Sequence, residues 1–392
     1  MNLMEVCGTV VTGFEEIARK EIISKISNVS NIHHRRGNVT FTVEFESLRS
    51  LLLLRSIDNL FVIFYENTIE GLRKMEKDVA MKTIQNEISF MNWKKGIEAW
   101  QEIRQRNIYG GVDGVVEQMR RYMKEGIKTD VTEESPKYRV TCKRAGDKGM
   151  HQFTSMDAAW KFGAEINNVF GWKTSMKEFD IEVVLRIEQD SMTVMISLND
   201  ESMFKRNICA YGPTTMRSTM CYCMVSMLEP RDGDIILDAM CGGGSIPIEG
   251  AITNRNAFFI GGDNHQMAMD RCQLNWENNK TVIGGNCDFC MWDALSLPFK
   301  DNSIDGIVTD LPFGKKIGST VDNRLLYPKL LEEWNRVLKI GGRLVILTHD
   351  KRSLANSKTR ETTFWQNQQC YTVNVGGLSC YCLKLVKVQP PK

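Results

Sequence analysis

Two short segments of the chain combine a carboxylate with an unusual turn. The first, Asp310-Leu311-Pro312-Phe313-Gly314, follows an apolar strand predicted from Ile304 to Thr309. Asp310 supplies an acceptor, Pro312 fixes the turn and lacks an N–H, and Phe313 offers an aromatic face. An exocyclic amine of a base is a poor nucleophile because its lone pair is delocalised into the ring. The segment could be an ordinary turn. Otherwise we predict that it is a catalytic loop, in which the Asp310 carboxylate and the Leu311 carbonyl accept hydrogen bonds from such an amine and Phe313 stacks on the extruded base.

The second segment is a glycine-rich turn that follows a buried strand predicted from Ile235 to Asp238. Glycines at positions 242–244 allow positive φ and close backbone approach before a helix that begins near Ile246. We therefore predict that a small-molecule cofactor contacts Asp238, Cys241, Gly242 and Gly244. A dinucleotide fold is the competing interpretation, but the third position of its glycine fingerprint is Pro247 here.

Acidic residues also end the next two predicted strands. Asp263 ends the strand Phe258 to Asp263, where its two oxygens could accept from both ribose hydroxyls, with Asn264 assisting. Asp293 follows the strand Phe289 to Trp292 and could accept from an adenine amine. Acids at the ends of successive strands, together with the amine-directed loop, predict methyl transfer from S-adenosylmethionine.

The segment Gly212-Pro213-Thr214-Thr215 precedes a predicted helix that contains Arg217. It has two interpretations. It could be a plain capping loop, or it could cross the methionine end of the cofactor, with Thr214 in contact and Arg217 near the carboxylate. Both remain open at this point.

Composition limits the class of protein. The chain has 392 residues, 42% of them hydrophobic and 25% charged, with a net charge of +2, as expected for two or three soluble domains. No apolar run approaches the roughly 18 to 20 residues of a membrane span, and no secretory signal precedes Glu5, so we expect a cytoplasmic protein without membrane contact. Its 12 cysteines are expected to be reduced thiols. The pair Cys287 and Cys290 lacks a second ligand pair, so we predict no metal site.

Hydrophobic periodicity divides the chain into four parts. Residues 1–70 are predicted to form a ferredoxin-like βαββαβ unit, because strand and helix patterns alternate in that order. Residues 71–134 are charged and helical in composition, so we expect a helical bridge. Residues 135–204 are predicted to form a second α+β module whose helix begins near Thr154, with Thr154, Ser155 or Asp157 as its cap. Residues 205–392 are predicted to form a seven-stranded, doubly wound α/β domain.

Charge is unevenly distributed in the middle of the chain. Between positions 135 and 177 eight Lys or Arg face three acids, whereas from 178 to 204 seven acids face one Arg. The basic stretch is either a solvated face or a surface for phosphate contacts. On the second interpretation, the predicted RNA-binding residues are Lys143, Arg144, Lys173, Lys205 and Arg206.

Several strings carry a resemblance to known families. Residues 135–204 look like a THUMP domain on the following strings: Tyr138-Arg-Val-Thr-Cys-Lys-Arg-Ala, Phe153-Thr-Ser, Ala158, Gly163, Trp172 and Phe179-Asp-Ile-Glu-Val. The C-terminal half resembles the amine-directed N-methyltransferases through its Asp-x-Pro-Phe loop. Nearly the whole chain is similar to the THUMP-domain-containing protein 3 type of tRNA guanine-N2 methyltransferase, on these strings: Leu54-Arg-Ser-Ile-Asp-Asn-Leu-Phe-Val, Gly212-Pro-Thr-Thr-Met-Arg-Ser-Thr, Thr309-Asp-Leu-Pro-Phe-Gly-Lys and Val373-Asn-Val-Gly-Gly-Leu.

The resemblance implies an S-adenosylmethionine-dependent enzyme that forms N2-methylguanosine in the tRNA acceptor stem, around position 6. It also implies a small zinc-binding activator subunit as partner. The chain departs from the family pattern at Leu311, which replaces a proline, and at Ala239 and Gly243 in the glycine turn, where we expect modestly weaker cofactor affinity. Two rival functions remain: a ribosomal RNA guanine-N2 methyltransferase, and a non-catalytic tRNA-binding protein.

Overall fold

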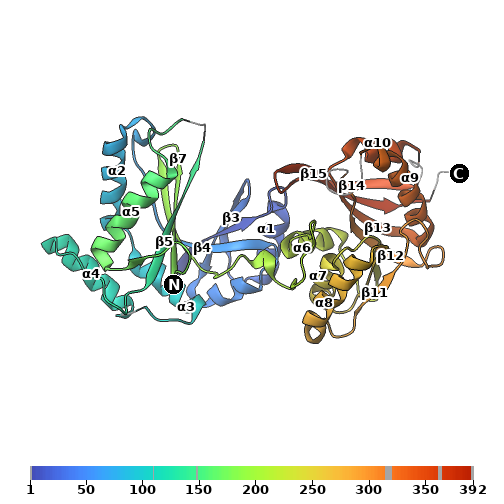
Figure 1. Cartoon of the computed structure of the whole chain (residues 1–392), viewed down its shortest axis with the longest axis horizontal. Helices are drawn as coiled ribbons and strands as arrows, with labels where there is room; N and C mark the ends of the chain where they lie inside the picture. The colour runs from blue at the N-terminus through green and yellow to red at the C-terminus, as the bar shows by residue number, and fades with distance from the viewer. Residues whose placement is uncertain (1, 109, 147–148, 314–319, 361–363, 390–392) are drawn as a thin grey trace.

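The computed structural model describes residues 2–389 apart from 109, 147–148, 314–319 and 361–363. The chain folds into two halves that lie side by side along the long axis of the molecule, with the N-terminal half in blue and green and the C-terminal half in yellow to red (Figure 1). Each half is built on one sheet: eight strands in the first and seven in the second, counted over the described residues.

The N-terminal half contains the following elements: β1 (Leu3–Val10), α1 (Glu15–Lys25), β2 (Ser30–Arg35), β3 (Asn38–Glu44), η1 (Phe45–Leu53), β4 (Ile57–Thr68), η2 (Leu72–Lys74), α2 (Lys77–Asn86), η3 (Glu87–Phe90), α3 (Trp93–Arg104), α4 (Gly111–Glu125), β5 (Lys137–Ala145), α5 (Ser155–Phe170), β6 (Lys173–Thr174), β7 (Ile181–Glu188) and β8 (Ser191–Ser197).

The C-terminal half contains these elements: η4 (Met203–Lys205), α6 (Ser218–Leu228), β9 (Ile235–Asp238), α7 (Ser245–Thr253), β10 (Phe258–Asp263), α8 (Gln266–Ile283), β11 (Cys287–Met291), β12 (Ile304–Asp310), α9 (Thr320–Val337), β13 (Leu338–Thr348), α10 (Lys351–Arg360), β14 (Trp365–Val375) and β15 (Leu378–Lys387).

The first four strands pair in the order β2-β3-β1-β4, which is the ferredoxin-like arrangement expected from the sequence. Along β3, Val39, Phe41 and Val43 are buried and alternate with partly exposed residues. This period of two places one face of the strand on the core. The helix expected after β3 is instead the 3₁₀ segment η1, which buries Leu48 and Leu51.

Strands from the first and third predicted segments share one sheet. β4 pairs with β8 in an antiparallel ladder, so the sheet continues as β4-β8-β7-β5-β6 into the second module. Of the helices in the expected bridge, α3 packs on this sheet, and α2 and α4 pack against α5. α3 buries Ile97 and Trp100 in the same hydrophobic core that contains Val62 of β4 and Ile196 of β8. The sequence could not show this pairing, since the two strands are more than 100 residues apart.

The main helix of the second module begins where the sequence predicted. Thr154 caps α5 through its hydroxyl, which accepts from the backbone of Asp157 at 3.1 Å, and the Asp157 carboxylate accepts from the backbone of Thr154 at 2.8 Å. This reciprocal capping box satisfies two N–H groups at the helix start. The helix ends at Gly171, whose φ of +62° is left-handed.

The C-terminal half is doubly wound. Its strands follow the order β11-β10-β9-β12-β13-β15-β14, with β15 antiparallel to its neighbours. α6 and α7 contribute to the core on one face, and α9 and α10 contribute to the core on the other. The Rossmann-like α/β architecture predicted from the sequence is therefore confirmed. In the described residues, no helix is both long and apolar enough to cross a membrane.

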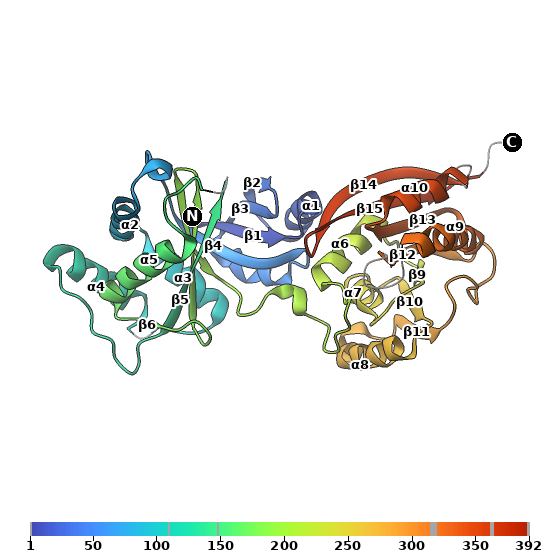
Figure 2. The ribbon, with the colours of Figure 1, turned by 45° about the horizontal axis from the view of Figure 1, so that its top comes forward.

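The two halves are joined by more than the connecting chain. The β14–β15 hairpin reaches over to α1, where Asn374 N–H donates to Thr12 O at 2.9 Å (Figure 2). The guanidinium of Arg55 forms a two-pronged ion pair with Glu249 of α7, and its Nη2 lies 2.7 Å from Oε2. Thr219 of α6 donates to Asp58 at 2.6 Å. Arg55 and Asp58 belong to one of the strings that carry the family resemblance. In the structure, these two residues join the N-terminal half to the catalytic half.

Candidate active site

The catalytic half gathers acidic residues at one edge of its sheet. β9, β10 and β12 are parallel, and they end at Asp238, Asp263 and Asp310. Because the carboxyl ends of parallel strands meet at the same edge, the three acids lie where open α/β sheets have their binding crevice, next to the reversal of strand order between β9 and β12. β11 ends two residues before Asp293, at the same edge. The strand ends predicted from the sequence therefore converge.

The glycine turn leaves room above itself. Gly242 has φ +55°, and a Cβ built on it would meet no atom within 4 Å. Gly244 has φ +79°, and a Cβ there would lie 2.7 Å from Cys272 Sγ, so only glycine fits. The Gly242 N–H donates to Asp263 Oδ2 at 3.0 Å, and the His265 N–H donates to Oδ1 at 3.0 Å. Asp263 thus holds the turn, and each carboxylate oxygen retains acceptor capacity for a hydroxyl.

The other predicted cofactor-binding residues differ in how exposed their side chains are. Asn264 and Asp293 are exposed beside the crevice, and Asp293 Oδ1 accepts from the Leu295 N–H at 2.9 Å. Cys241 is a correction. Its thiol is buried against Cys272, its backbone N–H donates to Gly262 O of β10, and its C=O accepts from the Gly244 N–H. It shapes the turn and does not line the crevice.

Asp238 is buried and held by the neighbouring strand. Its Oδ1 accepts from the Thr309 hydroxyl at 2.8 Å and from the Met240 N–H at 3.3 Å. Burial raises the pKa of Asp238 to about 7, against the opposing effect of these two hydrogen bonds. Thr309 was not singled out from the sequence, where it reads as one residue of an apolar strand.

Asp310 has an unsatisfied oxygen. Its Oδ1 is buried and has no hydrogen-bond partner among the described residues. Burial, with a smaller contribution from Asp238, raises the pKa of Asp310 well above the ordinary range. A buried carboxylate oxygen without a donor is costly, so an N–H group that enters the site would relieve that cost.

The loop after Asp310 is fixed at successive residues. The Leu311 N–H donates to Leu347 O at 2.9 Å, and the Pro312 carbonyl accepts from the side chains of Asn323 and Tyr327 on α9. Phe313 is half-buried, with its ring centroid 6.2 Å from that of His349. Gly314 lies outside the described residues, and so do Lys315 and Lys316, which follow it in the sequence.

The segment before α6 requires a second correction. Thr214 is exposed, but Arg217 pairs with Asp58 at 3.2 Å and lies over the Phe204 ring, so its charge is directed to the N-terminal half. Arg271 of α8, which sequence reasoning missed, lies against Gly212 in this segment. Arg271 Nε would lie 2.9 Å from a Cβ on Gly212, and this nitrogen is buried with no partner in the described part of the chain.

A buried asparagine holds the chain before α6 against the glycine turn. Asn275 of α8 accepts from the N–H groups of Cys209 and Ala210 at 2.9 and 2.8 Å. Its amide donates to the Gly243 carbonyl at 2.9 Å. The segment that leads to Thr214 is therefore tied to the crevice, and nothing in the local sequence signals this contact.

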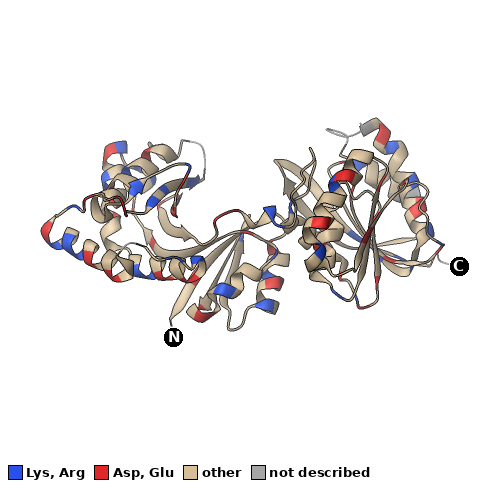
Figure 3. Cartoon of the chain, turned by 60° about the horizontal axis from the view of Figure 1, so that its bottom comes forward, with Lys and Arg blue, Asp and Glu red and all other residues tan. Residues whose placement is uncertain are grey.

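Of the five predicted RNA-binding residues, two are corrected. Lys173 donates to the Glu133 carbonyl at 2.8 Å, and Arg206 donates to the carbonyls of Met203 and Leu54 at 2.7 and 2.9 Å. Both cations stabilise the backbone and are not free for phosphate. Lys143 and Arg144 are exposed at the end of β5, and Lys205 is exposed beside Glu201. Figure 3 shows basic and acidic residues interspersed along the helices of both halves.

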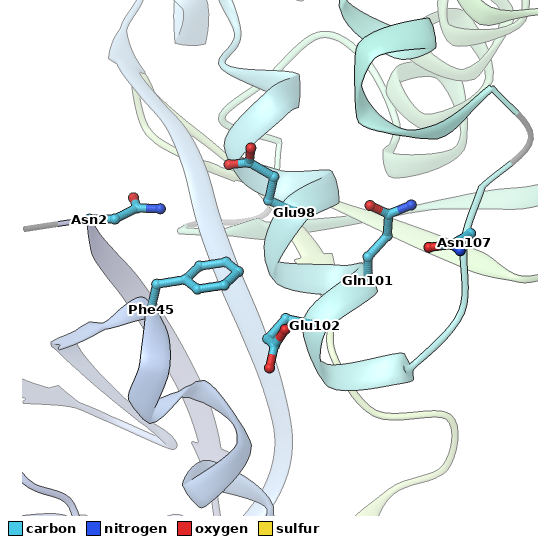
Figure 4. A pocket seen from close by; sticks show the side chains of 6 residues that line it. All are labelled: Asn2, Phe45, Glu98, Gln101, Glu102 and Asn107. Atoms are coloured by element: carbon cyan, nitrogen blue, oxygen red, sulfur yellow. The ribbon is translucent and has the colours of Figure 1, made fainter.

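Two other features do not belong to the site. A cavity of about 370 Å³ lies between η1 and α3 in the N-terminal half, lined in part by Phe45, Glu98 and Glu102 (Figure 4). It is acidic and lies in the opposite half from the crevice. Within the described residues, no three His, Cys, Asp or Glu side chains gather as a metal site. Cys287 is buried and Cys290 is exposed, as their odd spacing along β11 requires.

Fold and site together define a Rossmann-like methyltransferase with an N-terminal THUMP-type region. Residues 206–380 match the family model described as "UPF0020: RMKL-like, methyltransferase domain". The chain is 34% identical to the tRNA (guanine(6)-N(2))-methyltransferase THUMP3 of Bos taurus over 444 residues, covering 96% of this chain and 87% of the relative. The chain belongs to the THUMP3 family of tRNA (guanine(6)-N(2))-methyltransferases.

Solved structures share the whole fold. TrmN from Thermus thermophilus superposes with a TM-score of 0.75 at 18% identity, over 98% of this chain and all of that one. The methyltransferase SMU.472, solved in complex with SAH, superposes with a TM-score of 0.69 at 14% identity, over 100% of this chain and 99% of that one. These likenesses establish that both halves occur together in the same order in other proteins.

Proposed function

We propose that the chain transfers a methyl group from S-adenosylmethionine to the exocyclic N2 amine of a guanosine in the tRNA acceptor stem, at position 6. The observation that carries this proposal is that Asp310 Oδ1, at the carboxyl end of β12, is buried without a hydrogen-bond partner among the described residues. The activity for which the THUMP3 relatives are named supplies the choice of RNA and nucleotide.

In this mechanism, the Asp310 carboxylate and the Leu311 carbonyl accept from the N–H groups of the amine and aim its lone pair into the crevice. The cofactor supplies a methyl group on a sulfonium. As the carbon–nitrogen bond forms and the carbon–sulfur bond breaks, Asp310 takes the proton that the amine loses. Phe313 stacks on the extruded base and keeps it in line.

The open glycine turn supports binding of the cofactor in the crevice. The space above Gly242 would accept a bound group, and Asp263 retains lone pairs for ribose hydroxyls. Asp293 and Asn264 are exposed where an adenine would lie. We assign the carboxylate of the cofactor to Arg271 in place of Arg217, because Arg271 Nε is buried against Gly212 without a partner in the described residues.

The RNA would reach both halves. Lys143 and Arg144 extend from the end of β5, and Lys205 lies on the connection to the catalytic half. At the site itself, Lys351 and Arg352 are exposed at the start of α10, next to His349 and Phe313. These cations support phosphate contact on either side of the target base.

The family resemblance also suggests a small zinc-binding activator subunit. The surface that we propose for it is the edge strand β11 with α8, which pack together. Met291 of β11 and Met267 of α8 expose 48% and 60% of their surface there. An unpaired edge with exposed methionines is suited to a partner that adds a strand.

The test is methylation of defined transcripts. Purified chain, with and without a co-expressed activator, is incubated with labelled S-adenosylmethionine and with wild-type tRNA, with tRNA that carries inosine at position 6, or with ribosomal RNA. Inosine lacks the N2 amine, so label should enter the first RNA alone. Transfer to the inosine substrate would contradict N2 chemistry, and transfer only to ribosomal RNA would favour the rival substrate. Binding of tRNA without transfer in either preparation would indicate a non-catalytic protein.

A further inference from the structure

The carbonyl of Pro312 is held by two buried side chains of α9. Tyr327 Oη donates to it at 2.7 Å, and Asn323 Nδ2 donates to it at 3.0 Å. The two residues lie four apart, so they share one helical face. Both are 1% exposed. Two polar side chains so fully buried on one acceptor form a specific contact, since each would be costly to bury without a partner.

Each donor is itself fixed by the end of β13. Tyr327 Oη lies 2.9 Å from Thr348 Oγ1, which accepts from the Asp350 N–H at 2.9 Å. Asn323 Nδ2 also donates to Asp350 Oδ2 at 3.2 Å. The network therefore ties the loop to a helix and to a neighbouring strand at the same time.

This network acts together with the bond from the Leu311 N–H to the Leu347 carbonyl. A peptide group is planar, so the Leu311 N–H fixes the plane that joins Asp310 to Leu311. In the same way, the Pro312 carbonyl fixes the plane that joins Pro312 to Phe313. Between the two planes, the ring of Pro312 fixes its own φ and disfavours the helical region for Leu311, so the freedom of the loop is reduced.

We propose that Asn323 and Tyr327 are positioning residues for methyl transfer. They touch neither base nor cofactor, and they act through Pro312 to set the direction of Phe313 and of the Leu311 carbonyl relative to Asp310. This inference rests on the proposed function, in which that loop holds the target amine. Misplacing a reacting group by about 1 Å can cost on the order of 10²-fold in rate, so the loss of one anchor is expected to be visible in the chemical step.

The test compares Tyr327→Phe with Tyr138→Phe. Tyr138 is also 1% exposed, and its hydroxyl donates to a backbone carbonyl, Gly163 O, at 2.6 Å, but it lies in the N-terminal core. The single-turnover rate is measured at saturating cofactor and tRNA, together with the dissociation constants of both and the melting temperature. Tyr327→Phe should lower the rate about tenfold at unchanged affinities, whereas Tyr138→Phe should lower only the melting temperature. Asn323→Leu should behave as Tyr327→Phe does.

A second readout does not depend on activity. Amide hydrogen exchange, followed by mass spectrometry on the peptide that contains positions 309–313, should be faster in Tyr327→Phe and unchanged in Tyr138→Phe. Unchanged exchange, or a Tyr327→Phe rate within twofold of the parent, would overturn the inference. If the parent enzyme methylates none of the RNAs while exchange responds as expected, the proposed substrate fails and the anchoring of the loop stands.

Discussion

The hydroxyl of Thr309 donates to the carboxylate of Asp238 at 2.8 Å and so joins the two halves of the site. Asp238 ends β9 below the glycine turn, and Thr309 is the residue before Asp310 on β12. The cofactor end and the base end of the crevice are therefore held in one register by a buried hydrogen bond. The same contact brings two carboxylates with raised pKa values close enough to affect each other.

This arrangement predicts that cofactor affinity rises with pH. In the free protein the pKa of Asp238 is about 7, and the pKa of Asp310 is raised well above its ordinary value. A bound sulfonium would favour the ionised carboxylates and lower both pKa values, so the complex holds fewer protons than the free protein. The sign follows from linkage: affinity increases as pH rises through 7, by at most about tenfold per unit for each proton released.

Calorimetric titration of S-adenosylmethionine from pH 6 to 8.5, in buffers with different ionisation enthalpies, measures this proton release. Asp310→Asn should flatten the profile at its alkaline end. If the dissociation constant of the parent does not vary with pH, the two carboxyl groups do not change their protonation when the cofactor binds.

Substitutions of Arg271 and of Arg217 should have different effects on cofactor binding. Replacing Arg271 by Met should weaken S-adenosylmethionine on the order of tenfold or more, because this variant cannot make a charge-assisted hydrogen bond to the carboxylate. Arg217→Met should leave affinity unchanged, since that guanidinium pairs with Asp58. Isothermal titration on both variants distinguishes the structural assignment from the sequence-based one. The reverse order of effects would restore Arg217 to the cofactor site.

These two arginines show which features of the candidate site could be predicted from the sequence and which could not. β9 and β10 have the bounds predicted for them, because short apolar runs that end in an acid are a local signal. The direction of a long side chain is not local. Arg217 was expected inside the helix that follows Thr215 but directly precedes it, and its partner Asp58 lies 159 residues earlier in the chain. The role of Arg206 was missed for the same reason, because its acceptor Leu54 belongs to the other half.

Buried polar contacts were equally hidden. Asn323 and Tyr327 lie on a helix whose sequence also contains exposed Arg324 and Leu325, so nothing in the pattern shows which polar groups face inward. The continuous eight-stranded sheet was missed because the pairing of β4 with β8 depends on packing across the whole N-terminal half. The periodicity of each strand was sufficient to predict that strand but not its neighbour.

The ion pair between Arg55 and Glu249 predicts a strong effect on stability. Glu249 is 1% exposed and also accepts from Asn207 at 2.7 Å. Glu249→Ala leaves the partly buried Arg55 without a counter-charge, which should cost about 3–5 kcal/mol. Asp301→Ala, which removes a partner of Arg336 on the surface, should cost within about 0.5 kcal/mol. Urea unfolding of the whole chain compares the two variants, and equal midpoints would show that the junction contributes little.

Charge reversal at Lys143 and Arg144 should weaken tRNA binding at any sequence. For each phosphate that the variant no longer neutralises, the slope of log affinity against log salt should fall by about 0.7 to 0.9, while cofactor affinity stays unchanged. Lys20→Glu provides a control, since Lys20 is an exposed lysine of α1 outside the predicted surface. A slope that is the same in the parent, the double variant and the control would mean that the basic end of β5 is only solvated.

The most direct prediction concerns Asp310. Asn keeps its shape but replaces one acceptor oxygen with donors, so the amine N–H loses its partner in the transition state while tRNA and cofactor still bind. Single-turnover transfer at saturating cofactor should fall by on the order of 10²-fold or more. Phe313→Ala should also slow transfer, because the extruded base loses stacking worth about 1 to 3 kcal/mol. Asp305→Asn, at the far end of the same strand, should have little effect on the rate. An Asp310→Asn enzyme within a few-fold of the parent would show that the end of β12 is not where the amine reacts.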